Sequence, residues 1–244
     1  MKPQIRCYYW GEGRSLVNLG DSLVPIILDA LGYTCVSRFV ENSRVVNPGR
    51  CLLAIGSLLT HNDLAAVGCP VDVWGCGWKG SPLVTSHWKG MKIHAVRGPH
   101  SITSLQLPSQ TAIGDPALLI PYLLSMPVVH HGKSLVIPHC FRIRAFSASH
   151  RCAQTGCDEV LSPMILTTPW YKTSWRTLAS ILYQRGRFGL NTLTQQKALV
   201  RIAGAKFVLT GSLHGAILAQ AFGVPWAAYN DGYVNAPAKW QDWA

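Results

Sequence analysis

The sequence of 244 residues has few charged side chains and no long apolar run. Charged residues make up 14% and apolar residues 48%, which excludes a disordered chain and a coiled coil. No apolar stretch reaches the roughly 18 residues that a membrane span needs, and the longest candidate, 112–124, is broken by Pro116 and Pro121. The N-terminus lacks the apolar core of a signal peptide. These absences predict a cytoplasmic protein with a sizeable core.

Several catalytic motifs are also missing. The sequence contains no GxxxxGK[ST] loop, no HExxH pair and no GxSxG turn. The eight cysteines include no CxxC pair, and Cys152 and Cys157 have four residues between them. Zinc sites usually need closer pairs, so we expect reduced thiols in or near the core, no metal and no cofactor.

Acidic residues are scarce, and the basic excess is uneven. The chain has 22 basic and 11 acidic residues; residues 1–125 carry a net charge of +3 and residues 126–244 one of +8. No Asp or Glu occurs between residues 160 and 230. Such a surface attracts anionic ligands, glycans or membranes, although a solvated basic face needs no partner. Because the basic residues are scattered and no nucleic-acid motif accompanies them, we expect no nucleic-acid partner.

Short apolar segments that end in glycine or proline turns alternate with helical patterns, which is typical of parallel sheets. The predicted strands are 5–10, 36–40, 51–55, 71–74, 93–96, 111–113, 134–137, 160–164, 206–209 and 225–229. The predicted helices are 21–31, 117–124, 175–183, 194–203 and 213–222. We predict an α/β fold of two Rossmann-like lobes with parallel sheets facing a cleft. The lobes are 1–125 and 134–244, with a linker at 126–133.

Candidate binding residues follow several predicted strands, at the carboxyl ends where such sheets bind ligands. They are Gly56 and Ser57, Arg97, Asp115, His139 and Ser212. Arg97 offers a planar fork for a carboxylate or phosphate, and His214 sits at a helix start whose N–H groups form an anion site. The alternatives are a turn arginine for Arg97 and a structural cap for His214. Asp21 and Asp115 are read first as helix caps, with Pro25 in the first turn after Asp21.

An ordered set of motifs carries a family resemblance. It comprises Asn18-x-Gly20-Asp21, Arg97-Gly98-Pro99, Gly114-Asp115-Pro116-Ala117, Pro138-His139, Leu213-His214-Gly215-Ala216 with Ala221-Phe222-Gly223-Val224-Pro225, and Lys239-Trp240-Gln241-Asp242-Trp243. In this order the motifs resemble the polysaccharide pyruvyl transferase family, most closely its exopolysaccharide-modifying branch.

The resemblance implies a GT-B-like fold and an enzyme that needs no metal. Its reaction moves the enolpyruvyl skeleton of phosphoenolpyruvate to a sugar, forms a pyruvate ketal across two hydroxyls and releases phosphate. It implies Arg97 as the donor ligand and His214 as the family's helix-start histidine. Because the reaction needs proton transfer, which a histidine can supply, we expect His214 to carry it, with His139 as the second candidate. Ser212, Gly215, Asn18, Asp21, Gly56, Ser57 and Asp115 complete the expected substrate-binding set. The expected acceptor is a saccharide, free or lipid-linked at the inner membrane surface.

The sequence departs from the family pattern at one position. Many members have Arg directly before Leu-His-Gly, where this chain has Ser212, in a loop expected to face the cleft and solvent. Arg142, Arg144 or Lys133 could supply the missing cation. The chain also leaves little sequence for a closing C-terminal helix.

Two other functions stay open at this stage. One is a GT-B glycosyltransferase that uses a nucleotide sugar, which usually needs an acidic residue for the ribose. Such a residue is scarce before Asp231 in the second lobe. The other is a non-catalytic anion- or glycan-binding protein, suggested by the charge and by Ser212.

Overall fold

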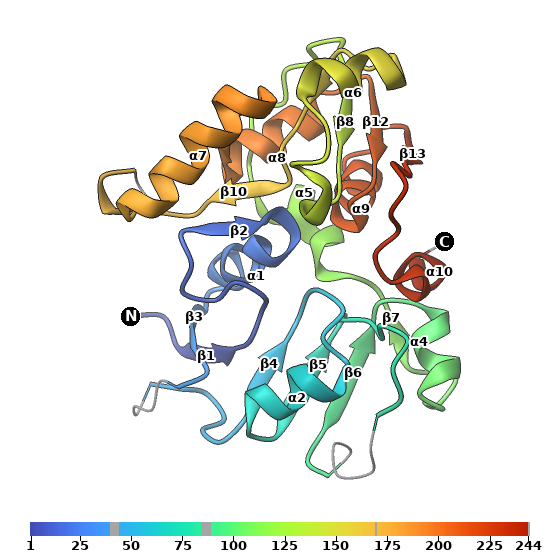
Figure 1. Cartoon of the computed structure of the whole chain (residues 1–244). Helices are drawn as coiled ribbons and strands as arrows, with labels where there is room; N and C mark the ends of the chain where they lie inside the picture. The colour runs from blue at the N-terminus through green and yellow to red at the C-terminus, as the bar shows by residue number, and fades with distance from the viewer. Residues whose placement is uncertain (40–43, 84–88, 169, 244) are drawn as a thin grey trace. The chain divides into compact units, whose positions relative to one another are not determined.

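The computed structural model describes residues 1–39, 44–83, 89–168 and 170–243 (Figure 1). The chain forms two compact units that do not follow the sequence in order. Unit 1 comprises Met1–Glu12, Leu23–Leu119 and Ala236–Ala244, whereas unit 2 comprises Gly13–Ser22 and Ile120–Asn235. The predicted lobes differ from these units chiefly in the two short segments 13–22 and 236–244.

Unit 1 is built on a six-stranded sheet in which all pairings are parallel. In spatial order its strands are β3 (Thr34–Ser37), β1 (Gln4–Cys7), β4 (Cys51–Leu53), β5 (Val71–Trp74), β6 (Lys92–Val96) and β7 (Ala112–Ile113). Leu53, Val73 and Val96 are fully buried and belong to one apolar core. Burial of these side chains stabilises the centre of the sheet, whereas both residues of the edge strand β7 are exposed. Of the predicted strand 36–40, Val40 lies outside the described residues.

The helical segments of unit 1 are short. They are α2 (His61–Val67), α4 (Pro99–Ser104), η1 (Pro116–Leu119), α10 (Pro237–Trp243) and most of α1 (Leu19–Ala30). Thr60 caps α2 by accepting a hydrogen bond from the Asp63 N–H, and Gly68 closes the helix with φ of 69°. The expectation that little chain is left for a C-terminal helix is wrong, because α10 forms and contacts α4.

Unit 2 holds a four-stranded parallel sheet with the order β13 (Trp226–Ala228), β12 (Phe207–Thr210), β8 (Ser134–Ile137) and β9 (Glu159–Val160). Leu135, Val136 and Val208 are buried on it. Its helical segments are α5 (Ile120–Leu123), η2 (Cys140–Arg142), α6 (Ala148–Thr155), η3 (Trp170–Lys172), α7 (Trp175–Phe188), α8 (Gln195–Ala203) and α9 (Leu213–Ala221). Taken unit by unit, the predicted α/β fold with Rossmann-like parallel sheets is confirmed.

A second, three-stranded sheet in unit 2 was not predicted. Its order is β11 (Leu193–Thr194), β10 (Met164–Leu166) and β2 (Leu16–Asn18), and β10 pairs with β2 in antiparallel fashion. The single predicted strand 160–164 is wrong, because Pro163, which has no N–H to donate, separates β9 from β10. The expectation of only parallel pairing therefore fails in this sheet.

Helix α1 begins earlier than the sequence suggested. The Leu19 N–H donates to the Pro163 carbonyl at 2.8 Å, which fixes the helix start directly after β2. Pro25 consequently lies inside the helix and not in its first turn. Asp21 lies inside the first turn, so the expectation that it precedes the helix as a cap is wrong. The early start depends on the hydrogen bond to Pro163, next to strand β10, and no local sequence pattern predicts this contact.

Candidate functional site

The predicted histidine loop and serine loop of unit 2 lie side by side. Strands β8 and β12 pair in parallel, with Ile137 opposite Thr210, so the turns that follow both strands meet at one sheet edge. The Gly211 N–H donates to the Ile137 carbonyl at 2.8 Å. A side chain at Gly211 would come within 3.2 Å of the His139 backbone nitrogen. The structure thus brings His139 next to the Ser212 loop.

Ser212 and Gly215 are held tightly at the start of α9. The Thr210 hydroxyl accepts from the Ser212 N–H at 3.0 Å and donates to the Ser212 carbonyl at 2.8 Å. A Cβ on Gly215 would lie 2.4 Å from that same hydroxyl, so this glycine permits close packing of α9 on β12. Ser212 is buried, so the expectation that it faces solvent is wrong. The hydrogen bonds that pull the loop onto Thr210 account for this.

His214 packs against the first turn of α1. A Cβ on Gly20 would lie 2.0 Å from the His214 Nδ1 and 2.2 Å from its Cγ, so only glycine allows this approach. In the same turn Asn18 donates from Nδ2 to the Asp21 carboxylate at 2.8 Å. His214 and Asp21 are both buried. The predicted residues Asn18, Asp21 and His214 therefore belong to one cluster, which sequence order alone did not require.

His139 is fixed by contacts on both ring nitrogens. Its Nδ1 accepts from the Phe141 N–H at 3.3 Å, and its Nε2 lies 3.2 Å from the Asn235 side-chain amide. Because Nδ1 accepts, the neutral ring carries its proton on Nε2, to which the Asn235 amide would turn its oxygen. The Tyr233 ring lies 5.8 Å from the imidazole. These contacts give the buried His139 a defined tautomer.

Two arginines share one carboxylate next to the His139 loop. Arg142 Nε lies 3.2 Å from one Asp231 oxygen, and Arg151 Nη1 lies 2.9 Å from the other. The Arg151 side chain is fully buried, whereas that of Arg142 is 29% exposed. The cluster has one more positive than negative group, so Arg142 has the charge to receive an anion.

Arg142 is also the best placed of the three basic residues that the sequence offered in place of the missing arginine. Lys133 precedes β8, at the amino end of the strand, and its Nζ lies 3.8 Å from Glu159. Arg144 donates to the Ser180 hydroxyl of α7 at 3.4 Å. Arg142 lies at the carboxyl end of β8, in the turn that begins at His139.

The predicted residues of unit 1 form a separate, closed cluster. Arg97 donates from Nη1 to the Ser57 hydroxyl at 3.0 Å and to the Gly56 carbonyl at 3.4 Å. Its Nη2 lies 3.2 Å from the Asp242 carboxylate, and neither side chain is exposed. Asp242 also accepts from the N–H and the hydroxyl of Ser101, both at 2.8 Å. Arg97 is therefore neither a surface turn residue nor an open fork.

Asp242 was missed as a functional candidate, although it lies in the predicted Lys239–Trp243 motif. The only sequence signal was its rarity, since residues 126–244 contain just 4 acidic side chains. Two glycines leave room for the Arg97–Asp242 pair. A Cβ would lie 2.3 Å from Arg97 Nη2 at Gly77 and 1.6 Å from the Asp242 carbonyl at Gly98.

The glycines of residues 75–80 have the GxGxxG spacing of a dinucleotide-binding loop. That motif needs a helix start on which the pyrophosphate lies, and no helix begins in the described residues 75–83. Gly77 instead lines Arg97, so packing explains it. Burial raises the pKa of the neighbouring Cys76 thiol to about 12, with the Arg97 charge opposing the shift.

Asp115 accepts from the Ala117 N–H at 3.0 Å, which confirms its role as a cap.

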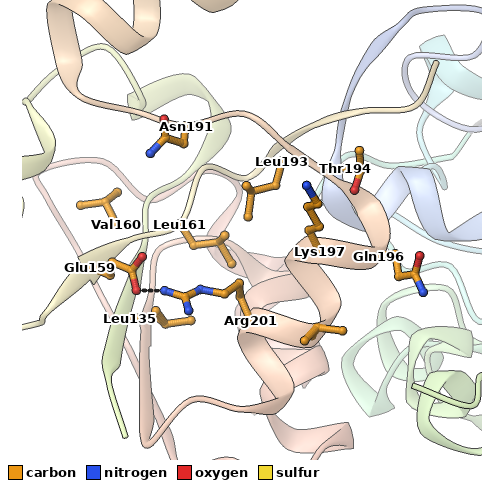
Figure 2. A pocket seen from close by; sticks show the side chains of 11 residues that line it. Leu135, Glu159, Val160, Leu161, Asn191, Leu193, Thr194, Gln196, Lys197 and Arg201 are labelled. Carbon is orange, nitrogen blue, oxygen red and sulfur yellow. Dashed lines mark hydrogen bonds and ion pairs between the residues drawn. The ribbon is translucent and has the colours of Figure 1, made fainter. Parts of the chain in front are cut away.

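A cavity of about 400 Å³ opens elsewhere in unit 2, between α8 and strand β9 (Figure 2). Its floor is apolar, and its rim carries Lys197 and the ion pair between Arg201 and Glu159. None of the predicted site residues lines it. Among the described residues, no group of His, Cys, Asp and Glu side chains could hold a metal ion.

The fold and the site define a class: an α/β protein whose parallel strands carry histidines, arginines and a helix start at their carboxyl ends. The sequence model of the polysaccharide pyruvyl transferase family matches residues 18–232, and the chain belongs to that family. The predicted resemblance is thereby confirmed. The chain is also 26% identical over 248 residues to the succinoglycan biosynthesis protein ExoV of Rhizobium meliloti (strain 1021). That alignment covers all of this chain and 64% of the relative, so the chain spans less than two thirds of the relative's length.

Proposed function

We propose that this chain transfers a pyruvyl group from phosphoenolpyruvate to a sugar of a polysaccharide or of its precursor. Two sugar hydroxyls form bonds to the central carbon of the donor, whose bond to the phosphate oxygen breaks. One hydroxyl proton goes to the donor methylene, which becomes the methyl group of the ketal, and the other leaves with phosphate. The observation that carries the proposal is that His139 and Arg142 follow strand β8 and His214 follows the paired strand β12, at the same edge of the unit 2 sheet, in a chain from this family.

His139, His214 and Arg142 supply the groups that this reaction needs. A histidine side chain can take a proton from a hydroxyl or give one to the methylene carbon. We assign that exchange to His214 first and to His139 second. The start of α9 and Arg142 would hold the donor anion, in place of the arginine that Ser212 replaces.

For Arg97 the contacts favour positioning over donor binding. A donor anion could reach its guanidinium only in competition with Asp242, which already lies at 3.2 Å. We propose that Arg97 holds the Gly56–Ser57 turn in place and so keeps the carboxyl end of β4 in shape. The distinction can be tested, because a positioning role changes stability before it changes donor affinity.

Phosphate release from phosphoenolpyruvate tests the proposed function directly. The purified chain is incubated with the donor and with free or lipid-linked oligosaccharides, and ketal formation on the sugar is followed in parallel. Acceptor-dependent phosphate release that His214→Gln reduces supports the proposal. Thermal stabilisation by a nucleotide sugar and none by phosphoenolpyruvate would instead support a glycosyltransferase.

One observation favours a second candidate, a non-catalytic anion- or glycan-binding protein. Position 212 carries a serine where many members of the family have an arginine, so it offers no cation to a phosphate. Ser212 is also buried, and its backbone is hydrogen-bonded to Thr210. Binding of phosphoenolpyruvate without phosphate release on any acceptor is the result that this candidate predicts.

A further inference from the structure

Helix α7 presents an apolar face to solvent. Figure 1 shows it in orange at the outer side of unit 2, beyond α8. Trp175, Ala179, Leu182 and Gly186 follow one another at spacings of four, three and four, which places them on one helical face. Trp175 is 73% exposed and Leu182 66%. Tyr183 borders this face and is 55% exposed.

The opposite face of α7 packs onto unit 2. Its residues are each two positions after those of the exposed face, and all of them are buried or half-buried: Thr177, Ile181, Gln184 and Phe188. Ser174 caps the helix by accepting from the Thr177 N–H at 3.3 Å, and Gly189 ends it with φ of 65°. The helix is thus docked on one side and ended at both termini, so its exposed apolar face is a fixed feature of the fold.

Positive charges flank the apolar face. Arg176 and Arg187 lie on one side of it, Arg185 lies on the other, and Lys172 lies in the preceding η3 beside Tyr171. Among the described residues none of these four cations makes an ion pair, and the sequence has no acidic residue from 160 to 230 to offer one. We call these exposed side chains the α7 surface: Tyr171, Lys172, Trp175, Arg176, Leu182, Tyr183, Arg185 and Arg187.

We propose that the α7 surface docks on a bilayer that contains anionic phospholipids. An interfacial helix of this kind lays Trp, Tyr and Leu side chains into the headgroup region while its arginines pair with lipid phosphates. Both features are present here in one rigid helix. The proposal goes beyond the transfer reaction, since docking needs neither donor nor acceptor. Within the part of the chain that the structure describes, no helix is long and apolar enough to span a membrane.

Two other occupants fit the α7 surface less well. A second copy of the chain would bring two such surfaces together, and their unpaired cations would repel each other. An acidic glycan would satisfy the cations and could stack on Trp175. However, a hydrated sugar gains little from the exposed aliphatic chain of Leu182, whereas the bilayer interface does.

Vesicle sedimentation tests the proposal. The chain is mixed with vesicles of phosphatidylcholine alone or with about 30% phosphatidylglycerol, at low salt and at about 0.5 M NaCl. We expect binding to the anionic vesicles only, weakened by salt. Arg185→Gln with Arg187→Gln should reduce the partition coefficient about 25-fold, since each arginine contributes about fivefold near such a surface. Trp175→Ala with Leu182→Ala should reduce it about fivefold or more.

The matched control removes two exposed lysines from unit 1, Lys79→Gln with Lys92→Gln, and should bind as the parent does. All variants change exposed residues, and a thermal melt checks that each is folded. Quenching of tryptophan fluorescence by brominated lipid should be reduced by Trp175→Phe.

The proposal fails if the parent chain does not bind anionic vesicles or if the control loses as much binding as the arginine variant. It also fails if only the arginine variant is affected, or if the chain binds a soluble polyuronate but no vesicles. Since no donor or acceptor is present, failure here leaves the proposed reaction untouched, and loss of phosphate release leaves docking untouched.

Discussion

The two units use the carboxyl ends of their parallel strands in opposite ways. In unit 1 the basic side chain at that edge, Arg97, is buried and faces a buried carboxylate, Asp242, at 3.2 Å. In unit 2, Arg142 and Arg151 share the single carboxylate of Asp231, and Arg142 reaches solvent. A balanced buried pair has no charge left for a ligand, whereas the unbalanced cluster does. The same strand-end position therefore holds a closed ion pair in unit 1 and a net positive charge in unit 2, where we propose the donor site.

The largest expected effect tests His214, at the start of α9 in unit 2. His214→Gln should lower kcat by about 10²–10⁴-fold, the usual contribution of general acid–base catalysis, while donor binding changes little. Glutamine keeps a polar amide against Gly20 but cannot exchange a proton. Steady-state kinetics with direct donor binding separates the two quantities.

The matched control for this change is His94→Gln, which removes an exposed histidine of unit 1 that lies 3.0 Å from Asp72. It should leave kcat unchanged. If His214→Gln reduces donor affinity alone, His214 is an anion ligand, and His139 takes the proton-transfer role. A fully active His214→Gln would remove His214 from catalysis.

The next largest effect tests the closed cluster of unit 1. Asp242→Ala leaves the Arg97 guanidinium buried without its carboxylate, which should lower the free energy of unfolding by about 3–5 kcal/mol. Urea unfolding measures this loss. Asp29→Ala is the control, because its ion pair with Lys2 is exposed, and its loss should cost less than about 1 kcal/mol. Equal costs in the two variants would mean that the Arg97–Asp242 pair is not a stabilising centre.

The third prediction compares the two ends of strand β8. Arg142→Gln should weaken donor binding about 10- to 150-fold, since a hydrogen bond to a charged group contributes about 1.5–3 kcal/mol. Asp231 keeps Arg151 as a partner, so the fold should persist. Lys133→Gln removes the same charge at the amino end of β8 and should leave donor binding unchanged. Titration calorimetry with phosphoenolpyruvate gives both affinities, and a larger loss in Lys133→Gln would contradict the placement of the anion site.

The parts of the fold that the sequence predicted are those with a local signal. Strands β5 and β8 match their predicted ranges because each is a short, mostly apolar segment followed by a glycine or a proline. Helices α8 and α9 agree within one or two residues, because Gly204 and Gly223 mark their ends. Helical periodicity also located α7, although the helix runs five residues further, to Phe188.

The parts that the sequence could not predict depend on distant contacts. Ser101 and Asp242 are 141 residues apart, and nothing near either residue announces their hydrogen bonds. The antiparallel pairing of β2 with β10 likewise joins segments that are far apart in sequence, and it shifts the start of α1. Motif order identified the family, but only the packing of His214 on Gly20 shows that the first turn of α1 and the start of α9 lie against each other.

The smallest expected effect concerns a second ion pair of unit 1, between Arg50 and Asp72 on the sheet. This pair is half-buried, whereas the Arg97–Asp242 pair is fully buried. Arg50 Nε lies 2.7 Å from Asp72, and each side chain is 19% exposed. Burial alone would raise the pKa of Asp72, but hydrogen bonds from Arg50 and His94 hold it below its ordinary value of 3.8. A carboxyl whose pKa is lowered by folding stabilises the protein at pH values above the pKa of the unfolded chain, and this contribution disappears as the pH falls through the pKa of the folded protein.

Asp72→Asn should therefore lower the free energy of unfolding at pH 7 by no more than about 1 kcal/mol, because solvent screens the pair. The same substitution should cost almost nothing once the pH lies below the folded pKa of Asp72. Urea unfolding of both proteins at neutral and acidic pH measures the difference, and a cost that stays constant with pH would assign the effect to packing and not to the ion pair.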